Sequence, residues 1–205
     1  MNNAIILCVA AYFAGALPVG LVVARVWKGI DVRDHGSGNI GATNVFRVVG
    51  PIAGTIVFVV DVLKGLWPPL VAVCIGANSW WQIAAAMSAI IGHNFSIFIG
   101  FKGGKGISTS LGALFGISWK VGLSAWTLWG ILLAATHYVS VGSIAASISL
   151  VPLTMIFYPG DTARLTFAAV AGLFSLYRHR ANIVRLKNGT ESKFGKKKES
   201  DIASN

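Results

Sequence analysis

A hexapeptide rich in glycine and lysine, FKGGKG at residues 101–106, interrupts an otherwise apolar part of the chain. Glycine lets backbone N–H groups approach a ligand closely, and lysine supplies positive charge, so the pattern is typical of a phosphate cradle. The nucleotide P-loop differs, because it has four residues between its glycines and a hydroxyl residue after its lysine. Here Gly100 and Gly104 enclose three residues, and Gly106 follows Lys105. The hexapeptide therefore indicates a phosphate other than that of ATP.

The same glycines directly precede a predicted helix at residues 107–118. The first N–H groups of a helix and the positive end of its dipole favour an anion. A flexible loop with ordinary basic residues is the alternative, but glycines interleaved with lysines exceed what membrane topology alone requires. The predicted phosphate contacts of this stretch are Lys102, Gly103, Gly104, Lys105 and Gly106.

A second polar stretch, SGNIGATNVFR at residues 37–47, sets hydroxyl, amide and guanidinium groups among small residues. Such a run presents several hydrogen-bond donors, and an arginine can bind phosphate through two parallel hydrogen bonds. An ordinary loop of turn-forming residues is the alternative. The glycine–lysine stretch elsewhere in the chain favours the binding interpretation. The candidate residues are Ser37, Asn39, Thr43, Asn44 and Arg47.

A third polar stretch, RHRANIVRLKNGTE at residues 178–191, follows the last apolar segment. If it continues that segment as a helix, Arg178, Asn182 and Arg185 share one face, with His179 beside them. This face can hold a phosphate and supply an acid or a base. The alternative is a basic helix held by anionic lipid at the membrane surface. For His179, Asn182 and Arg185 we favour the site.

Four polar side chains lie within apolar segments, where each needs an explanation. Asp61 and Lys64 are three residues apart, and a charge at the bilayer centre costs about 2.5–3.5 kcal/mol, so a paired or functional role is expected. A mutual salt bridge accounts for both, while direct substrate contact stays open. For His93 we favour a structural role, as a buried histidine bonded to a neighbour. Ser143, at the N-terminus of a predicted helix, is a candidate for the anion site.

The composition places the protein in a membrane. Of 205 residues, 55% are hydrophobic and only 12% are charged, whereas a soluble domain carries about 25% charged residues. The net charge of +10 does not indicate nucleic acid, because base-reading modules and stacked aromatics are not visible. In a membrane protein it reflects topology and anionic headgroups. Cys8 and Cys74 fit no metal spacing and are interpreted as small buried hydrophobes.

These features predict an all-α integral membrane protein with about seven transmembrane helices. We expect the first span to be retained, because a charged n-region and an A-x-A-like cleavage site are not seen there. The stretch 107–118 is short, so a half-length or tilted helix is expected there. We expect a single domain over residues 1–192 and a basic, disordered cytoplasmic tail over 193–205. The predicted spans are 4–26, 51–77, 80–98, 107–118, 119–137, 141–157 and 164–176.

The distribution of lysine and arginine predicts the orientation of these spans. Basic residues gather in 28–47, in 99–106 and in the tail from 178 onward, whereas the opposite connections carry only Lys120 and Arg164. The N-terminus is then outside and the C-terminus cytoplasmic. Four polar stretches, at residues 36–47, 101–106, 138–143 and 178–191, fall on the cytoplasmic side, so segments far apart in the sequence are expected to converge on one site.

Several catalytic signatures are missing from the chain. None of the four histidines is followed five positions later by aspartate, so the H-x-x-x-x-D signature of the common glycerolipid acyltransferases is absent. The G-x-S-x-G nucleophile elbow and the D-x-D and H-E-x-x-H metal spacings are absent as well. With only 7 Asp and Glu residues, a two-metal phosphoryl-transfer centre is not expected.

In their order along the chain, SGNIGATNVFR, GHNFSIFIGFKGGKG and HRANIVRLKNGTE closely resemble the motifs of the bacterial PlsY family. The resemblance spans nearly the whole chain, as far as Glu191. It departs at Ile40 and Ser96, where members of the family often carry proline. The resemblance implies transfer of a fatty acyl group from acyl phosphate to the 1-hydroxyl of glycerol 3-phosphate. Lysophosphatidic acid and phosphate would be the products, with no cofactor and no metal.

The resemblance also implies a bacterial inner-membrane enzyme with a cytoplasmic active site, whose partners are its two substrates and membrane lipids. His179 and an oxygen of the substrate phosphate are both candidates for the base, and the phosphate is favoured. The implied catalytic residues are His179, Ser37, Arg47, Asn182 and Lys105. The implied substrate-binding residues are Asn39, Thr43, Asn44, Lys102, Gly103, Gly104, Gly106, Ser143, Arg178 and Arg185.

A small membrane anion or phosphate transporter is the alternative function. In that case the same cationic residues would form a phosphate pathway. A transporter predicts charges at mid-membrane depth and often inverted repeats. Here the cations cluster toward one face and repeats are not apparent in the sequence, so the acyltransferase is favoured.

Overall fold

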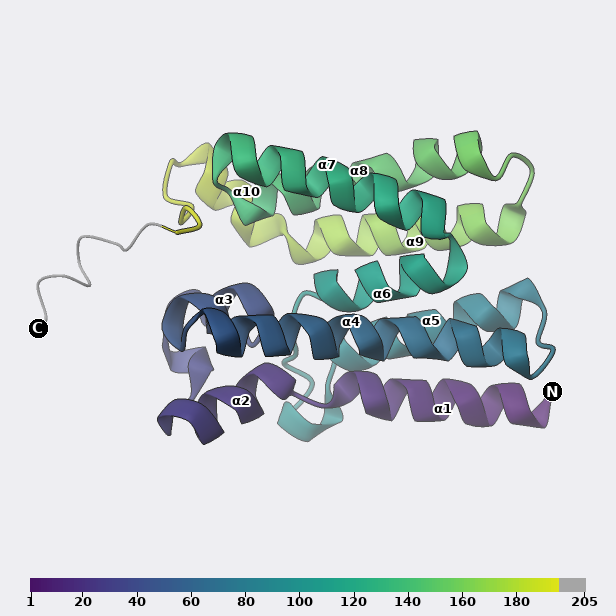
Figure 1. The fold of residues 1–205 in the computed structure, drawn as a ribbon, viewed down its shortest axis with the longest axis horizontal. Coiled ribbons are helices and arrows are strands. Elements are labelled where there is room, and N and C mark those ends of the chain that lie inside the picture. Colours follow the sequence, from purple (N-terminus) through teal and green to yellow (C-terminus); the bar gives the residue numbers. More distant parts are fainter. Residues whose placement is uncertain (196–205) are drawn as a thin grey trace, which may run out of the picture.

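The computed structural model describes residues 1–195, and every regular element within this range is a helix. The helices form one elongated bundle, and the N-terminus of α1 lies at the end opposite to α10 (Figure 1). An all-α fold is therefore confirmed. The elements are α1 Asn2–Ala16, α2 Val19–Lys28, η1 Val32–Asp34, α3 Ala42–Val48, α4 Pro51–Cys74, α5 Ser79–Asn94, η2 Ile97–Ile99, α6 Ile107–Ile117, α7 Trp119–Thr136, α8 Val139–Phe157, α9 Thr162–Arg178 and α10 Arg180–Lys187.

The first apolar segment, which the sequence predicts as one span over residues 4–26 interrupted only by Pro18, is divided into two helices. α1 ends at Ala16 and α2 begins at Val19. Pro18 lacks an N–H group and its ring disturbs the preceding turn, so the helix breaks there. The Leu17 carbonyl at the break accepts a hydrogen bond from Lys64. The two helices together still form an apolar segment, Asn2–Lys28, that is long enough to cross a membrane.

In the described part of the chain, 4 helical segments are long and apolar enough to cross a membrane. The short helix α6, with 11 residues, starts directly after the glycine stretch, as the sequence predicts. α7 and α9 run beside the longer helices (Figure 1). The total of seven spans and the membrane side of each terminus stay predictions. The 4 segments are Asn2–Lys28, Pro51–Cys74, Ser79–Ile99 and Val139–Phe157.

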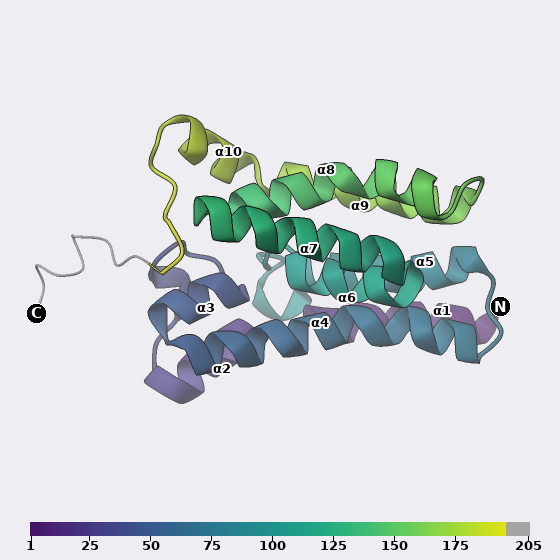
Figure 2. The ribbon, with the colours of Figure 1, turned by 45° about the horizontal axis from the view of Figure 1, so that its top comes forward.

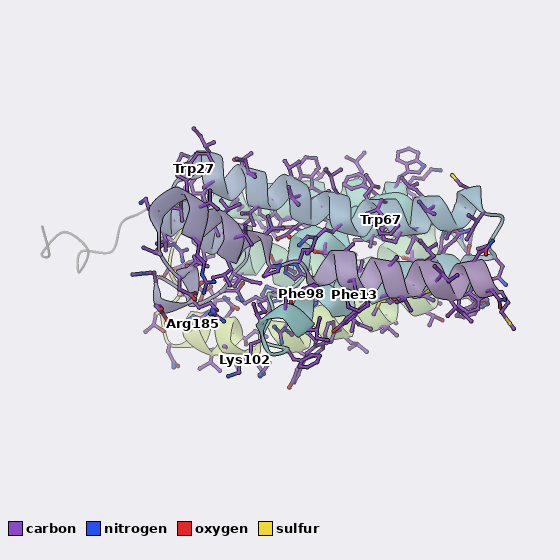
Figure 3. The ribbon with its side chains drawn as sticks, turned by 90° about the horizontal axis from the view of Figure 1, so that it is seen from below. Phe13, Trp27, Trp67, Phe98, Lys102 and Arg185 are labelled. Atoms are coloured by element: carbon purple, nitrogen blue, oxygen red, sulfur yellow. The ribbon has the colours of Figure 1, made fainter. Side chains whose placement is uncertain are left out.

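Large apolar side chains cover the outside of the bundle, while the tightest interior positions are alanines and glycines. Phe13, Trp27 and Phe98 are all exposed on the surface (Figure 3). This distribution reverses that of a water-soluble protein and suits a bundle whose outer surface faces lipid. Cys74 is also exposed and Cys8 is only partly buried, so the prediction that both cysteines are buried is wrong.

Glycines bring α4 and α6 into close contact. A Cβ atom at Gly65 would overlap the Thr109 carbonyl, and one at Gly112 would overlap the Val62 carbonyl. Small residues at such positions let two helix backbones approach each other in a membrane. α6 is thereby held in the middle of the bundle, between the α1–α5 group and the α7–α9 group (Figures 1 and 2).

The packed chain extends past the domain boundary that the sequence predicts at residue 192. The Phe194 ring lies 4.9 Å from the Phe46 ring, measured between centroids. The Phe194 N–H donates to the His137 carbonyl at 2.7 Å. Residues 193–195 therefore belong to the folded unit. The rest of the tail, residues 196–205, lies outside the described residues.

Candidate active site

One cavity of about 560 Å³ lies where the polar stretches meet. Its wall takes residues from 36–47, from the start of α6, from the turn between α7 and α8, and from 175–194. Asp61 of α4 and His93 of α5 line it as well. The predicted convergence of distant stretches is confirmed by this wall. The predicted site residues that line it are Ser37, Asn39, Thr43, Asn44, Arg47, Lys105, Gly106, Ser143, His179, Asn182 and Arg185.

Three residues of the glycine stretch lie outside the cavity wall. Lys102 is exposed on the outer side of its loop (Figure 3). The N–H groups of Gly103 and Gly104 donate to the carbonyls of Asn94 and His93, both at 3.1 Å. Because those N–H groups are already used, the two glycines do not offer them to a phosphate. This corrects the role that the sequence predicts for them.

Close packing against the end of α5 explains why these positions are glycine. A Cβ at Gly103 would overlap the His93 carbonyl, and one at Gly104 would overlap the His93 imidazole. Gly106 has φ +77°, a left-handed conformation that glycine adopts freely. A Cβ at Gly106 would also meet the Asn94 amide. The glycines thus let the loop lie flat on α5, and Gly106 alone of the three reaches the cavity wall.

Arg178 holds the glycine loop through the backbone carbonyls of that loop. Its guanidinium donates to the carbonyls of Gly104 and Gly103, the latter at 3.2 Å. α9 ends at Arg178 and α10 begins two residues later, so Arg178 and Asn182 do not share the face of one continuous helix. Arg178 lies outside the cavity wall and holds the loop, which corrects its predicted role in binding phosphate.

Asn44 organises the loop at residues 36–47 rather than facing a ligand. Its side chain is 2% exposed. Its Oδ1 accepts from the Ser37 N–H at 2.8 Å, and its Nδ2 donates to the Asn39 carbonyl at 2.8 Å. The same Nδ2 lies 3.1 Å from the carbonyls of Val32 and His35. Because these bonds occupy the side chain, we assign Asn44 to shaping the loop that presents Ser37.

A series of hydrogen bonds joins the glycine stretch to α10. The Lys105 Nζ donates to the Asn182 Oδ1 at 2.6 Å. The Asn182 Nδ2 donates to the Glu191 Oε1 at 2.7 Å, and the Arg185 Nε donates to the Glu191 Oε2 at 2.7 Å. An ammonium group carries three donors, so Lys105 keeps donors for a ligand after bonding Asn182.

Positive charge dominates the polar part of the cavity. Burial and the neighbouring Arg185 guanidinium lower the pKa of Lys105 to about 8, although the Glu191 carboxylate opposes the shift. Arg47 lines the wall and forms no ion pair within residues 1–195. Among the described residues the wall holds two carboxylates, of which Asp61 is paired with Lys64 and Glu191 with Arg185. This balance favours an anionic ligand.

His179 lies in the cavity wall as a neutral imidazole. Its Nδ1 is 2.9 Å from the Ser175 carbonyl. Because a carbonyl only accepts hydrogen bonds, Nδ1 carries the proton and Nε2 keeps a lone pair. Burial lowers the pKa of His179 to about 4, against the opposing effect of the Ser175 hydrogen bond. Near neutral pH, His179 can accept a hydrogen bond from a hydroxyl group, but it is a weak base.

Glu191 is a site residue that the sequence motifs did not single out. Burial opposes its ionisation, but hydrogen bonds from Asn182 and Arg185 keep the pKa of Glu191 below its usual value. It is the one carboxylate between Asp161 and Glu199, in a segment rich in cations. That isolated negative charge was the sequence feature from which Glu191 could have been predicted as a site residue. No group of three His, Cys, Asp or Glu side chains within residues 1–195 is placed to hold a metal ion.

The same cavity continues into an apolar groove between α6, α7, α8 and α9. One polar atom of the wall, the Trp129 Nε1, is buried without a hydrogen-bond partner in the described part of the chain. The cavity therefore joins a cationic pocket to a groove that suits a hydrocarbon chain. Apolar groove residues include Leu111, Leu114, Trp126, Leu150 and Phe167.

The two departures from the resembled motifs are accommodated outside the cavity wall. The Ser96 hydroxyl donates to the Ala16 carbonyl at the end of α1, at 2.5 Å. Ile40 is buried at 4% exposure, and its carbonyl packs against Gly20.

The fold and the cavity define a class of protein, a helical membrane protein with a cationic pocket that continues into an apolar groove. The chain belongs to the glycerol-3-phosphate acyltransferase family, whose model matches residues 5–189. A glycerol-3-phosphate acyltransferase of Lactiplantibacillus plantarum is 45% identical over 192 residues, covering 92% of this chain and 90% of the relative. One from Aquifex aeolicus is 41% identical over 194 residues, covering 94% and 100%.

Two solved structures share the fold. Both are crystal structures of PlsY (YgiH), described as an integral membrane glycerol 3-phosphate acyltransferase. The glycerol 3-phosphate form has a TM-score of 0.88 at 40% identity and covers 99% of this chain and 100% of that one. The lysophosphatidic acid form has a TM-score of 0.86 at 41% identity and covers 94% and 96%. The resemblance to the PlsY family is therefore confirmed.

Proposed function

We propose that this protein transfers a fatty acyl group from acyl phosphate to the 1-hydroxyl of glycerol 3-phosphate. The observation that carries the proposal is the single cavity in which a cationic pocket continues into an apolar groove. The names of the relatives support glycerol 3-phosphate as the acceptor. The gathering of basic residues at this end of the bundle supports a site on the cytoplasmic side of a bacterial inner membrane.

The cations of the pocket bring two anionic substrates together. Each substrate phosphate carries up to about two negative charges near neutral pH. Lys105, Arg47 and Arg185 offset this charge, so that both phosphates can occupy one site. The Ser37 hydroxyl and the α8 residue Ser143 add hydrogen-bonding groups to the wall. The acyl chain lies in the apolar groove, which fixes the carbonyl carbon beside the polar pocket.

Direct transfer needs little chemistry from the protein. The acceptor hydroxyl oxygen attacks the acyl carbonyl carbon, and the bond from that carbon to the phosphate oxygen breaks. The departing phosphate keeps the bonding electrons and takes the hydroxyl proton. Acyl phosphate is already activated, so positioning and stabilisation of the developing oxyanion suffice. The neutral His179 aligns the hydroxyl, and its low pKa favours the phosphate oxygen as the base.

A donor assay tests the proposed function. Purified protein is incubated with glycerol 3-phosphate and either acyl phosphate or acyl-CoA, and lysophosphatidic acid and the released group are quantified. We expect one phosphate per lysophosphatidic acid with acyl phosphate, and no thiol release with acyl-CoA. Equal turnover of acyl-CoA would overturn the donor assignment, and the absence of transfer from either donor would overturn the function.

The alkaline pH dependence is expected to report Lys105. Because the pKa of Lys105 is about 8, its charge is complete only well below that value and is lost as the pH rises through it. The kcat/KM for glycerol 3-phosphate, which reports the free enzyme, should therefore fall above about pH 8. In Lys105→Arg the side chain stays charged throughout, so this alkaline decline should disappear whatever the absolute rate. An unchanged decline in the variant would assign it to another group.

The unpartnered Trp129 N–H is expected to help hold the acyl donor. A buried donor without a partner costs about 1–3 kcal/mol, so a hydrogen bond from the Trp129 N–H to an acceptor atom of the ligand should stabilise the complex. We expect Trp129→Phe to raise the KM for acyl phosphate about five- to twentyfold. Trp126→Phe is the matched control, because Trp126 lines the same groove but its Nε1 is not a buried unpartnered atom. Equal effects of the two variants would contradict the assignment.

A further inference from the structure

Three buried ionisable side chains form a cluster where α4 meets α5. Asp61, Lys64 and His93 are each at most 5% exposed. The Lys64 Nζ lies 2.9 Å from the Asp61 Oδ1, and the His93 Nδ1 lies 3.6 Å from the same oxygen. Pairing Asp61 with Lys64 would by itself meet the need to neutralise a charge within a membrane bundle. The contact with His93 therefore calls for a further explanation.

The Lys64 side of this cluster is tied to the break in the first apolar segment. Lys64 donates a hydrogen bond to the Leu17 carbonyl, which lies between α1 and α2. α2 then leads toward the loop at residues 36–47, which lines the cavity. The cluster is thus connected to the segment that carries Ser37 and Arg47.

The His93 side of the cluster is tied to the glycine loop. The His93 carbonyl accepts the Gly104 N–H at 3.1 Å. Its imidazole lies so close to Gly104 that a Cβ there would overlap the His93 Nε2. The next residue, Lys105, reaches Asn182 at 2.6 Å. Two contacts therefore position Lys105: Asn182 bonds its Nζ, and His93 contacts the backbone of the preceding residue, Gly104.

We propose that Asp61 and His93 are positioning residues for the phosphate-binding lysine of this site. Asp61 orients the His93 imidazole, and the imidazole supports Gly104 so that Lys105 points into the cavity. Lys64 joins this support to the α1–α2 break. Both residues also line the cavity, and we assign their effect to the placement of Lys105 and not to contact with the reacting atoms. The inference rests on the proposed function only in that Lys105 binds substrate phosphate.

A double-mutant cycle tests whether His93 acts through Lys105. The kcat/KM for glycerol 3-phosphate is measured for His93→Phe, Lys105→Met and the double variant, with His93→Asn as a smaller replacement. We expect His93→Phe to lower kcat/KM at least tenfold when Lys105 is present and less than twofold in the Lys105→Met background. Asp61→Asn should follow the same pattern. Equal losses in both backgrounds would overturn the proposal, because a merely structural role does not depend on Lys105.

A labelling experiment gives a second readout that needs no turnover. The rate at which an amine-reactive ester modifies Lys105 is followed against pH by mass spectrometry, with the exposed Lys102 as the internal reference. We expect the Lys105 midpoint to rise by about one pH unit in His93→Asn, because a displaced loop returns the ammonium group to water. The Lys102 midpoint should not move. An unchanged Lys105 midpoint would overturn the proposal.

The control is Ser88→Ala, a substitution on the same helix. Ser88 bonds only the Ala84 carbonyl of its own helix, so neither kcat/KM nor the Lys105 midpoint should change. If no variant or wild-type protein transfers an acyl group, the proposed function fails while the labelling result still decides the positioning role. If transfer occurs and the Lys105 midpoint stays fixed in His93→Asn, the positioning role alone fails.

Discussion

Lys105→Met is expected to lower kcat/KM for glycerol 3-phosphate by about 10²- to 10³-fold, whereas Lys102→Met should change it less than twofold. Both lysines belong to the same hexapeptide, but Lys105 lines the cavity and bonds Asn182, while Lys102 is exposed outside it. A half-buried ammonium group that meets a phosphate dianion contributes about 3–4 kcal/mol, because little water screens the charge.

The Lys105 prediction is checked by steady-state kinetics on purified variants of equal thermal stability. Methionine keeps the length and the apolar stem of lysine, so the comparison isolates the charge. Equal losses for the two lysines would mean that the loop attracts substrate through its overall charge, and the specific site at Lys105 would be rejected. Little loss for either would remove the loop from substrate binding.

Gly112→Leu is expected to lower the apparent Tm by roughly 6–12 °C and to abolish acyl transfer. A side chain at this position would overlap the Val62 carbonyl, so α4 and α6 could not keep their present separation. Overpacking against backbone costs at least about 3 kcal/mol, and each kcal/mol shifts Tm by about 2–4 °C in a chain of this size. α6 carries Ser108 and Leu111 of the cavity wall, so the site is displaced together with the helix.

The matched control for Gly112→Leu is Gly130→Leu on α7, where a Cβ would meet no atom within 4 Å. Thermal unfolding in detergent and the donor assay are measured on both variants. We expect the control to keep both the Tm and the activity of the unmodified protein. A Gly112→Leu protein that melts within 2 °C of the control would contradict the close α4–α6 packing.

The convergence of the site could be predicted from the sequence because it depends on topology. Basic and polar loops gather on one side of a membrane protein, so Lys105 and Asn182, which are 77 residues apart, share an end of the bundle before any contact is known. The start of α6 after Gly106 followed from the same reasoning. Residue types and spacing were sufficient to predict these features.

Residue types alone could not predict which polar residues line the site and which ones hold the loops in place. Asn44 and Asn182 are both buried amides, yet Asn44 is occupied by its own loop and Asn182 bonds Lys105. Arg178 and Arg185 are likewise alike in chemistry, but one holds backbone carbonyls and the other pairs with Glu191. The deciding partners are carbonyls and side chains from distant segments, whose positions the spacing does not give.

The helix breaks show a similar limit. Pro18 ends a helix, while Pro68, Pro69 and Pro152 lie inside α4 and α8. Membrane helices tolerate proline where neighbouring groups satisfy the freed backbone. At the Pro18 break the neighbouring group is Lys64, which bonds the Leu17 carbonyl. Because that partner comes from another helix, the sequence around Pro18 does not show whether the helix continues.

The structure also bears on the transporter alternative. The cations of the site, Lys105, Arg47 and Arg185, line one polar pocket together. Asp61, which lines the same cavity, is paired with Lys64. A phosphate pathway would need cations that accompany the ion along its route. The arrangement fits an acyl-transfer site better than a conduit.

The central claim is that one cavity holds both substrates, so that the acyl group passes directly between them without an acyl-enzyme. An isotope-exchange measurement tests this most directly: the protein is incubated with acyl phosphate and labelled inorganic phosphate, with glycerol 3-phosphate omitted. The account predicts no label in acyl phosphate until glycerol 3-phosphate is added, when lysophosphatidic acid forms. Rapid labelling of acyl phosphate without the acceptor would show a covalent intermediate and contradict direct transfer.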